Sequence, residues 1–210
     1  MHNFLRSRLD CILVARGARK KSKAKQAESQ KVSTPRKGPV AAELVGDSVV
    51  CENTDLAREL YNQSRFGIKN EQGIIELSLH DALYLLEKEK IVVKSKRTGL
   101  TKEALFRRAV KLEPNFKVRH AVYSDFRNRG YIIKTALKFG ADFRVYDRGV
   151  NPGEDHAKWV VFPVKESETL TWHEFSAKNR VAHSTKKRLL IGCVDEEADV
   201  TYWEVRWIRP

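Results

Sequence analysis

The first half of the chain alternates apolar and polar positions in patterns typical of short strands and one amphipathic helix. Residues 45–50 place a Gly-Asp turn before a β-branched pair, which predicts a hairpin. Residues 79–88 repeat leucine on one helical face, and Ser78 with Asp81 forms a Ser-x-x-Asp capping box at the start of this helix. A shorter helix is expected at residues 54–61 and a strand at residues 91–93.

The second half begins with two helices and then changes to strands. The helices are expected at residues 102–112 and 114–129, with Pro114 in a first turn and Gly130 as a C-terminal cap. Beyond Gly130 the apolar runs become short, β-branched and aromatic-rich, and one helical stretch at residues 171–179 interrupts them. The expected strands cover residues 131–133, 142–146, 159–162, 189–194 and 200–207. This half is therefore expected to form an α/β domain with a mixed sheet.

These elements divide the chain into three segments. The polar, glycine-ended run at residues 94–99 indicates a domain boundary near residue 95. We therefore expect a small N-terminal α/β domain at residues 40–95 and a C-terminal α/β domain at residues 96–210, which places the fold in the α/β (α+β) class. Residues 1–39 form a basic N-terminal extension ahead of both domains.

The extension contains a strongly basic stretch. Residues 17–37 hold eight Lys or Arg, one acid, Glu28, and no aromatic residue. Such a composition buries too little apolar surface to offset the entropy lost on ordering. A flexible basic loop or arm is expected, which acts either as a solvated linker or as a nonspecific contact for phosphates.

Composition and charge narrow the possible partners. The chain has 210 residues, 41% of them hydrophobic, and a formal net charge of +13, so a polyanion such as nucleic acid is the first partner to consider. The three cysteines, Cys11, Cys51 and Cys193, are far apart and indicate neither a disulfide framework nor a zinc site. The apolar run at residues 11–15 is too short for a signal-peptide core or a membrane span. We expect a soluble, cytoplasmic protein from a reducing compartment.

Three polar residues lie at the ends of expected strands, where a rigid scaffold presents side chains to a shared cleft. They are Tyr146, His156 and Lys187. Each alone has an ordinary explanation: a packing tyrosine, a loop histidine and a solvated lysine. Together, in a basic chain without a metal-ligand motif, they match the needs of metal-free RNA cleavage.

That reaction needs a base, an acid and a cation. The base takes a proton from a ribose 2′-hydroxyl, which attacks the adjacent phosphorus, and the acid protonates the leaving 5′-oxygen. A cation stabilises the negative charge of the phosphorane, a role that suits lysine. Histidine, with an ordinary pKa of ~6.5, suits the acid. Tyrosine, with an ordinary pKa of ~10, needs a nearby cation to act as a base.

Three long motifs, in this order along the chain, resemble those of the tRNA-splicing endonuclease family, most closely its archaeal type. They occupy residues 123–131, 138–146 and 180–187. The resemblance extends from about residue 40 to the end of the chain, and it implies a nuclease-like C-terminal domain. Residues 1–39 match nothing in the family core.

The resemblance also assigns catalytic roles. The family's catalytic tyrosine, histidine and lysine fall on Tyr146, His156 and Lys187, separated by ten and thirty-one residues (156 − 146 and 187 − 156). This implies a tRNA-intron lyase that cleaves precursor tRNA at bulge-helix-bulge splice sites and leaves a 2′,3′-cyclic phosphate and a 5′-hydroxyl. The resemblance implies that neither a metal nor another cofactor is required.

Two further positions follow from the resemblance. The family clamps a bulged base between cationic or aromatic side chains, and Arg180 and Trp207 fall where these residues are expected. A guanidinium and an indole can stack on any base, which fits recognition by shape. For Trp207, core or interface packing is an equal alternative.

Assembly is implied in the same way. Family members pair through their C-terminal strands, and an acidic loop of one dimer enters a basic groove of another. The corresponding loop carries Asp195, Glu196, Glu197 and Asp199, for which a solvated turn is the alternative. The implied partners are precursor tRNA and either further copies of this chain, as a homotetramer, or a structural endonuclease subunit, as a heterotetramer.

Two other functions stay open. Glu154, Asp155 and Lys158 loosely resemble the acidic-plus-lysine sites of nucleases that bind Mg²⁺. A noncatalytic RNA-binding subunit of the same fold is the second alternative, and it is less favoured because such a subunit would lack one of the three catalytic residues.

Overall fold

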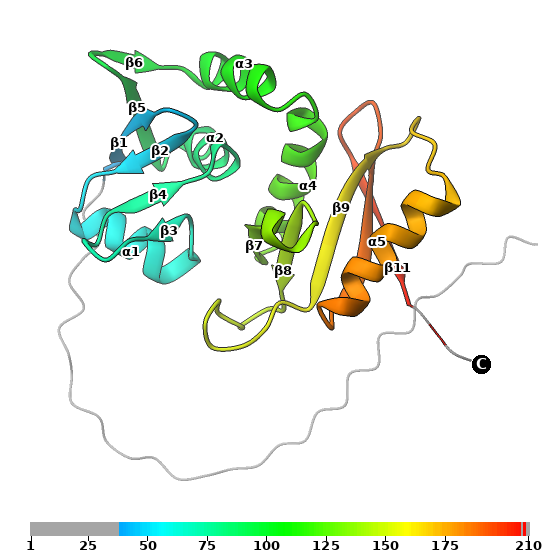
Figure 1. Ribbon diagram of the computed structural model, residues 1–210. Helices are drawn as coiled ribbons and strands as arrows, with labels where there is room; N and C mark the ends of the chain where they lie inside the picture. Colours follow the sequence, from blue (N-terminus) through cyan, green and yellow to red (C-terminus); the bar gives the residue numbers. More distant parts are fainter. Residues whose placement is uncertain (1–37, 207, 209–210) are drawn as a thin grey trace, which may run out of the picture. The chain divides into compact units, whose positions relative to one another are not determined.

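A computed structural model describes residues 38–206 and 208 of the chain. Two regions named in the sequence analysis lie outside the described residues: the basic stretch at residues 17–37, and Trp207, which was predicted to stack on a bulged base. The described part is built from two mixed sheets and their helices, which confirms the predicted α/β class (Figure 1). Within it, no helix is long and apolar enough to cross a membrane.

The first sheet has the strand order β3-β4-β2-β1-β5-β6, in which β1 and β5 are parallel and the other neighbours are antiparallel. Gly46, with a φ of 60°, lies in the turn of the predicted hairpin between β1 and β2. The strands are β1 (Val40–Val45), β2 (Ser48–Cys51), β3 (Ile68–Lys69), β4 (Ile75–Leu77), β5 (Ile91–Ser95) and β6 (Thr98–Leu100), and the helices are α1 (Asp55–Ser64) and α2 (Leu79–Glu87).

Helix α2 begins at the capping box predicted from the sequence. The Ser78 hydroxyl accepts a hydrogen bond from the Asp81 N–H at 3.1 Å, and the Asp81 carboxylate accepts one from the Ser78 N–H at 3.2 Å. Two N–H groups that the helix itself cannot bond are thereby satisfied. The helix packs on the first sheet and against the next two helices, so most of its residues are buried.

Removal of this cap is expected to destabilise the fold. Ser78→Ala should lower the free energy of unfolding by about 1 kcal/mol, because it leaves the Asp81 N–H without its acceptor. Urea denaturation followed by circular dichroism measures the change, with Ser78→Thr as the control that keeps a capping hydroxyl. Equal midpoints for the Ala and Thr variants would contradict the role of the cap.

The second sheet has the order β11-β10-β9-β8-β7, with β9 and β10 parallel and the other pairs antiparallel, so the predicted mixed sheet is confirmed. Its elements are α3 (Lys102–Leu112), α4 (Phe116–Asn128), β7 (Ile132–Thr135), the 3₁₀ helix η1 (Leu137–Phe139), β8 (Phe143–Tyr146), β9 (Trp159–Lys165), α5 (Trp172–Ser184), β10 (Arg188–Val194) and β11 (Val200–Val205).

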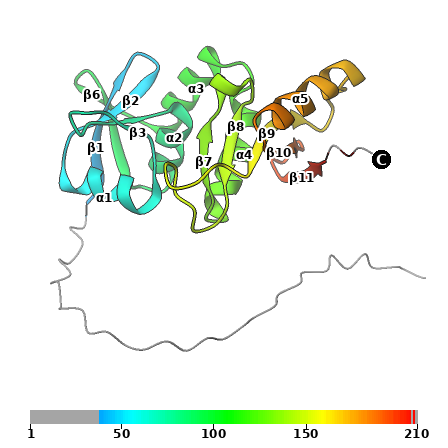
Figure 2. The same cartoon turned by 60° about the horizontal axis from the view of Figure 1, so that its bottom comes forward.

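Two helices cover opposite faces of this sheet (Figures 1 and 2). Helix α4 contacts β7, β9, β10 and β11, and it approaches β10 closely at Gly192, where an added Cβ would lie 3.0 Å from a methyl of Val122. Helix α5 packs on β9 and β10. Along β8, Phe143 and Val145 join the core on the α4 side, so the alternating residues Arg144 and Tyr146 point to the other face.

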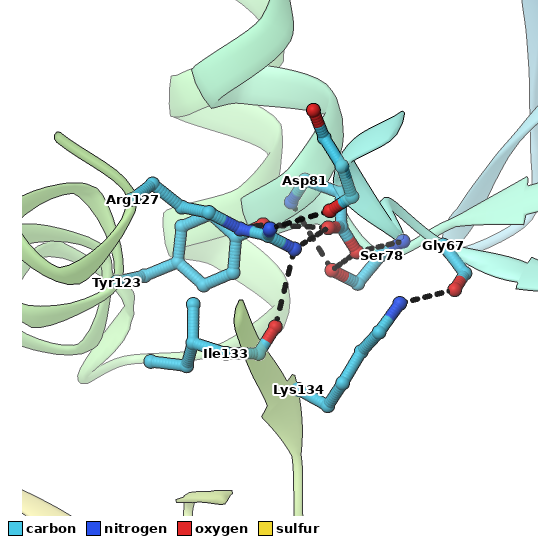
Figure 3. Close-up of polar contacts among 8 residues, drawn as sticks. Gly67, Ser78, Asp81, Tyr123, Arg127, Ile133 and Lys134 are labelled. Atoms are coloured by element: carbon cyan, nitrogen blue, oxygen red, sulfur yellow. Dashed lines mark hydrogen bonds and ion pairs between the residues drawn. The ribbon is translucent and has the colours of Figure 1, made fainter. Parts of the chain in front are cut away.

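A buried polar cluster connects α2 to α4 (Figure 3). The Tyr123 hydroxyl donates to Asp81 Oδ1 at 2.5 Å, and the guanidinium of Arg127 lies 3.6 Å from the same carboxylate and donates to the Tyr123 hydroxyl at 3.0 Å. Arg127 also donates to the Ser64 carbonyl at 2.9 Å. A buried charge is tolerated when it is paired and hydrogen-bonded. Here the pair of Asp81 and Arg127 links α2, which packs on the first sheet, to α4, which packs on the second.

Several boundaries differ from the sequence predictions. Helix α5 extends five residues beyond the expected end at residue 179, because Ala182 is buried against the sheet and prolongs the packed face. Strand β11 ends at residue 205 rather than 207. The polar run at residues 94–99 contains the end of β5, a turn at residues 96–97 and the start of β6, so the first sheet continues to residue 100. The division of the chain at residue 95 stays a prediction.

Candidate active site

One cavity is lined by all three predicted catalytic residues. Tyr146 ends β8, His156 lies in the loop between β8 and β9, and Lys187 directly precedes β10. Because β9 lies between β8 and β10, antiparallel to β8 and parallel to β10, the end of β8 and the starts of β9 and β10 lie at the same end of the sheet's strands. The cavity measures about 420 Å³. Its lining is formed by Phe139, Arg144, Tyr146, Gly153, Glu154, Asp155, His156, Ala157 and Lys187.

Tyr146 is held by the sheet and accompanied by a cation. It pairs with Ile132 on β7, and its side chain is 4% exposed. The guanidinium carbon of Arg144 lies 5.9 Å from the centre of the Tyr146 ring and also lines the cavity. The sequence reasoning missed Arg144, although its spacing of two residues from Tyr146 on a strand places both on one face.

The loop that carries His156 is held at its base and its tip. At the base, the Lys158 ammonium donates to the Asp147 carboxylate, and this hydrogen bond lowers the pKa of Asp147. At the tip, Arg65 donates to the Asn151 side chain at 3.4 Å and lies 3.9 Å from Glu154. These contacts hold the loop from the end of helix α1 and from the ends of β8 and β9.

Within this loop the His156 side chain is exposed to solvent beside the cavity, and its backbone N–H donates to Asp155 Oδ1 at 2.6 Å. An exposed imidazole at the mouth of a cavity can reach a bound substrate without a change in the core. The local hydrogen bond involves the backbone, so it does not depend on the imidazole.

Lys187 is directed into the cavity by the way helix α5 ends. The Lys187 N–H donates to the Ala182 carbonyl at 2.9 Å and the Lys186 N–H donates to the His183 carbonyl at 3.0 Å, a Schellman motif. Lys186 takes the left-handed φ of 54° that this motif requires. It is therefore the residue that ends the helix.

The Lys187 ammonium is placed by its own contacts. It donates to the Thr185 carbonyl at 2.9 Å and lies 5.4 Å from the centre of the Phe139 ring. A half-buried ammonium of this kind has donors left for an anion. His183, in the last turn of α5, lines a separate cavity of about 270 Å³ on which Lys187 also borders.

The other predicted site residues lie elsewhere. Arg180 is exposed on α5 and is not part of the catalytic cavity lining. The predicted assembly loop forms the turn between β10 and β11, so it lies at the end of β10 opposite Lys187. In this turn the Asp199 N–H donates to Asp195 Oδ1 at 2.9 Å, while Glu196 and Glu197 are exposed.

The residues of the metal-dependent alternative are engaged with other groups. Lys158 pairs with Asp147 and is not among the residues that line the cavity. Glu154 accepts hydrogen bonds from the Asn151 side chain at 3.1 and 3.0 Å. Among residues 38–206 and 208, no group of three or more His, Cys, Asp or Glu is arranged to hold a metal ion.

Comparisons with known proteins identify two family domains in the chain. Residues 40–106 match the family model for the N-terminal domain of tRNA intron endonuclease, and residues 116–202 match the one for its catalytic C-terminal domain. The three predicted catalytic residues, Tyr146, His156 and Lys187, fall within the second match.

Similar proteins named tRNA-splicing endonuclease occur in several archaea. The one from Thermococcus gammatolerans is 40% identical over 166 residues, which cover 79% of this chain and 96% of the relative. The one from Methanothermobacter thermautotrophicus is 39% identical with the same coverage of both chains. The one from Nanoarchaeum equitans is 43% identical over 141 residues, or 64% of this chain and 90% of the relative.

Proposed function

The chain belongs to the tRNA-splicing endonuclease family, a family of enzymes, and we propose that it is a catalytic subunit that excises introns from precursor tRNA. Cleavage takes place at bulge-helix-bulge splice sites, requires no metal, and leaves a 2′,3′-cyclic phosphate and a 5′-hydroxyl. The observation that carries the proposal is that one cavity is lined by Tyr146, His156 and Lys187.

Each residue has one role in the proposed reaction. Tyr146 accepts the proton of the ribose 2′-hydroxyl, and the 2′-oxygen attacks the adjacent phosphorus. His156 donates a proton to the 5′-oxygen as its bond to phosphorus breaks. The Lys187 ammonium stabilises the phosphorane between these two events, when the phosphate oxygens carry the most negative charge.

Arg144 supports the role of Tyr146 as the base. Its guanidinium carbon lies 5.9 Å from the centre of the Tyr146 ring and Arg144 lines the same cavity, so its side chain packs against the ring and helps to hold it toward the substrate. We therefore assign it as a positioning residue for the first proton transfer.

RNA recognition and assembly are proposed from the same family membership. Arg180 and Trp207 clamp a bulged base, and the acidic turn at residues 195–199 inserts into another dimer. Two cleavage sites at a fixed separation require two active sites, which favours a tetramer made of copies of this chain or of this chain with a structural subunit.

One experiment distinguishes the proposed metal-independent cleavage from the metal-dependent alternative. The purified chain is incubated in EDTA with an RNA that carries a bulge-helix-bulge, and single-turnover rates and end groups are measured. We expect the full rate without metal, and 3′ ends that resist phosphatase until the cyclic phosphate is opened. His156→Ala serves as the control for contaminating ribonuclease. Cleavage that returns only when Mg²⁺ is added would contradict the proposal and favour the acidic residues of the His156 loop.

A further inference from the structure

A second cavity adjoins the catalytic one. It measures about 600 Å³ and lies between β4 of the first sheet and β7 and β8 of the second. Phe139 and Arg144 line both cavities, and Pro152, from the loop that carries His156, lines the second. The two cavities therefore share a wall at η1 and β8, and a ligand in one is adjacent to the other.

The second cavity has an excess of positive charge. Four cations line it, Arg65, Lys134, Lys138 and Arg144, whereas its two carboxylates are Glu76 and Asp81. The Asp81 charge is already compensated inside the protein, because its carboxylate accepts the short hydrogen bond from Tyr123 and pairs with Arg127 (Figure 3). A net cationic lining remains.

The four cations differ in what they can contact. Burial lowers the pKa of Lys134 to about 8, and its ammonium donates to the Gly67 carbonyl, so it serves the internal structure (Figure 3). Lys138, in contrast, is exposed on η1. Arg144 lines both cavities, and its buried Nε atom has no hydrogen-bond partner in the described part of the chain.

Exposed apolar side chains lie on the rim between the cavities. The side chain of Leu137 is 70% exposed and that of Phe139 is 39% exposed. Their backbone is fixed, since the Phe139 N–H donates to the Ala136 carbonyl at 2.8 Å and Gly140 closes the 3₁₀ turn with a φ of 74°. Large apolar groups held outward by a rigid turn beside cations form the combination that binds bases and phosphates of single-stranded nucleic acid.

We propose that the RNA strand next to the cleaved bond continues from the catalytic cavity over Phe139 into the second cavity. Phe139 stacks on a base beside the cleaved phosphodiester, and Lys138 and Arg144 bind phosphates of the strand. This inference rests on the proposed function, because it takes the ligand of the catalytic cavity to be RNA. It adds a binding site for an adjoining nucleotide that the three catalytic residues do not provide.

The phosphate contact is tested through the salt dependence of binding. Dissociation constants for a bulge-helix-bulge RNA are measured at several salt concentrations in the His156→Ala background, which slows cleavage at least about a hundredfold. We expect Lys138→Ala to weaken binding severalfold and to lower the slope of log K against log salt by about 0.7–0.9, the loss of one phosphate contact. Lys111→Ala, on the exposed side of α3 and outside both cavities, is the matched control and should leave the slope unchanged.

The stacking contact is tested with a pair of substitutions at one position. Phe139→Leu keeps an apolar side chain but removes the ring, and it should weaken RNA binding about 5- to 100-fold, whereas Phe139→Tyr should bind normally. RNAs shortened by one nucleotide at a time, on either side of the cleaved bond, identify the nucleotide that stacks on Phe139. Once that nucleotide is removed, Phe139→Leu and the protein that retains Phe139 should bind the RNA equally.

The outcomes separate the two proposals. If Lys138→Ala and Phe139→Leu bind RNA as the parent does, the second cavity does not bind the strand, even when the unaltered chain cleaves. If the unaltered chain alone fails to cleave the RNA, an active assembly made only of copies of this chain is ruled out, and the binding series still decides whether this cavity contacts RNA.

Discussion

His156→Ala is expected to cleave precursor tRNA at least about a hundredfold more slowly than the unaltered chain, with little change in RNA affinity. The proposed step that it removes is protonation of the leaving 5′-oxygen. The fold should persist, because the imidazole is exposed and the hydrogen bond to Asp155 is made by the backbone of residue 156. Single-turnover rates at saturating enzyme, together with a binding titration, separate the chemical step from affinity.

A substrate with a sulfur leaving group distinguishes the acid from a merely structural histidine. A 5′-thiolate departs without protonation, so an RNA with sulfur at the bridging 5′ position should be cleaved by His156→Ala at a rate near that of the unaltered chain. His173→Ala, an exposed histidine of α5 away from the catalytic cavity, is the control and should cleave both RNAs normally. Equal slowing of His156→Ala on both RNAs would contradict the acid role.

The elements with strong local signals could be predicted from the sequence. Helix α3 matches its expected bounds, and the capping box of α2 is present as read from Ser78 and Asp81. These features depend on residues three or four positions apart, so a single sequence contains all the information needed. Helix α4 and the change to strands after it are also present, but α4 runs from Phe116 to Asn128 with Asn115 as its N-cap, so Pro114 lies before the helix and not in its first turn as predicted.

Features that depend on distant residues could not be predicted. The two-residue β3 is apolar at only one position and exists because it pairs with β4. The helical end at residue 184 depends on burial of Ala182 beneath the sheet. The loop that carries His156 is held partly by Arg65, which is ninety-one residues away (156 − 65) and has no local sign of that contact.

The candidate site shows the same limit. The positions of Tyr146, His156 and Lys187 at strand ends made them candidates. That they line one cavity follows from the order of the strands in the sheet, which the sequence alone does not give. The spacing of Arg144 on its strand predicts that it shares a face with Tyr146. Its contact with the Tyr146 ring depends on the side-chain positions in the fold, which the spacing does not give. Lys186 has no local sequence sign of its role, because its left-handed backbone, which ends α5 before Lys187, is seen only in the structure.

Lys187→Ala is expected to slow the chemical step about 100- to 1,000-fold, a loss of about 3–4 kcal/mol of transition-state stabilisation. The proposed ammonium contact strengthens as charge develops on the phosphorane, so the rate should fall far more than the affinity, which loses one phosphate contact. Lys187→Arg keeps the charge but replaces a compact ammonium with a planar guanidinium, and an intermediate rate is expected.

The neighbouring lysine provides the matched control for Lys187. Lys186→Gly also removes one positive charge from this turn, yet glycine adopts the left-handed backbone that residue 186 has, so the end of α5 and the direction of Lys187 should be kept. This variant should cleave at nearly the normal single-turnover rate. A normal rate for Lys187→Ala, or equal slowing of both variants, would contradict the specific role of the Lys187 ammonium. The phosphorane would then have to be stabilised by another cation, and Arg144 is the other Arg or Lys among the residues that line the cavity.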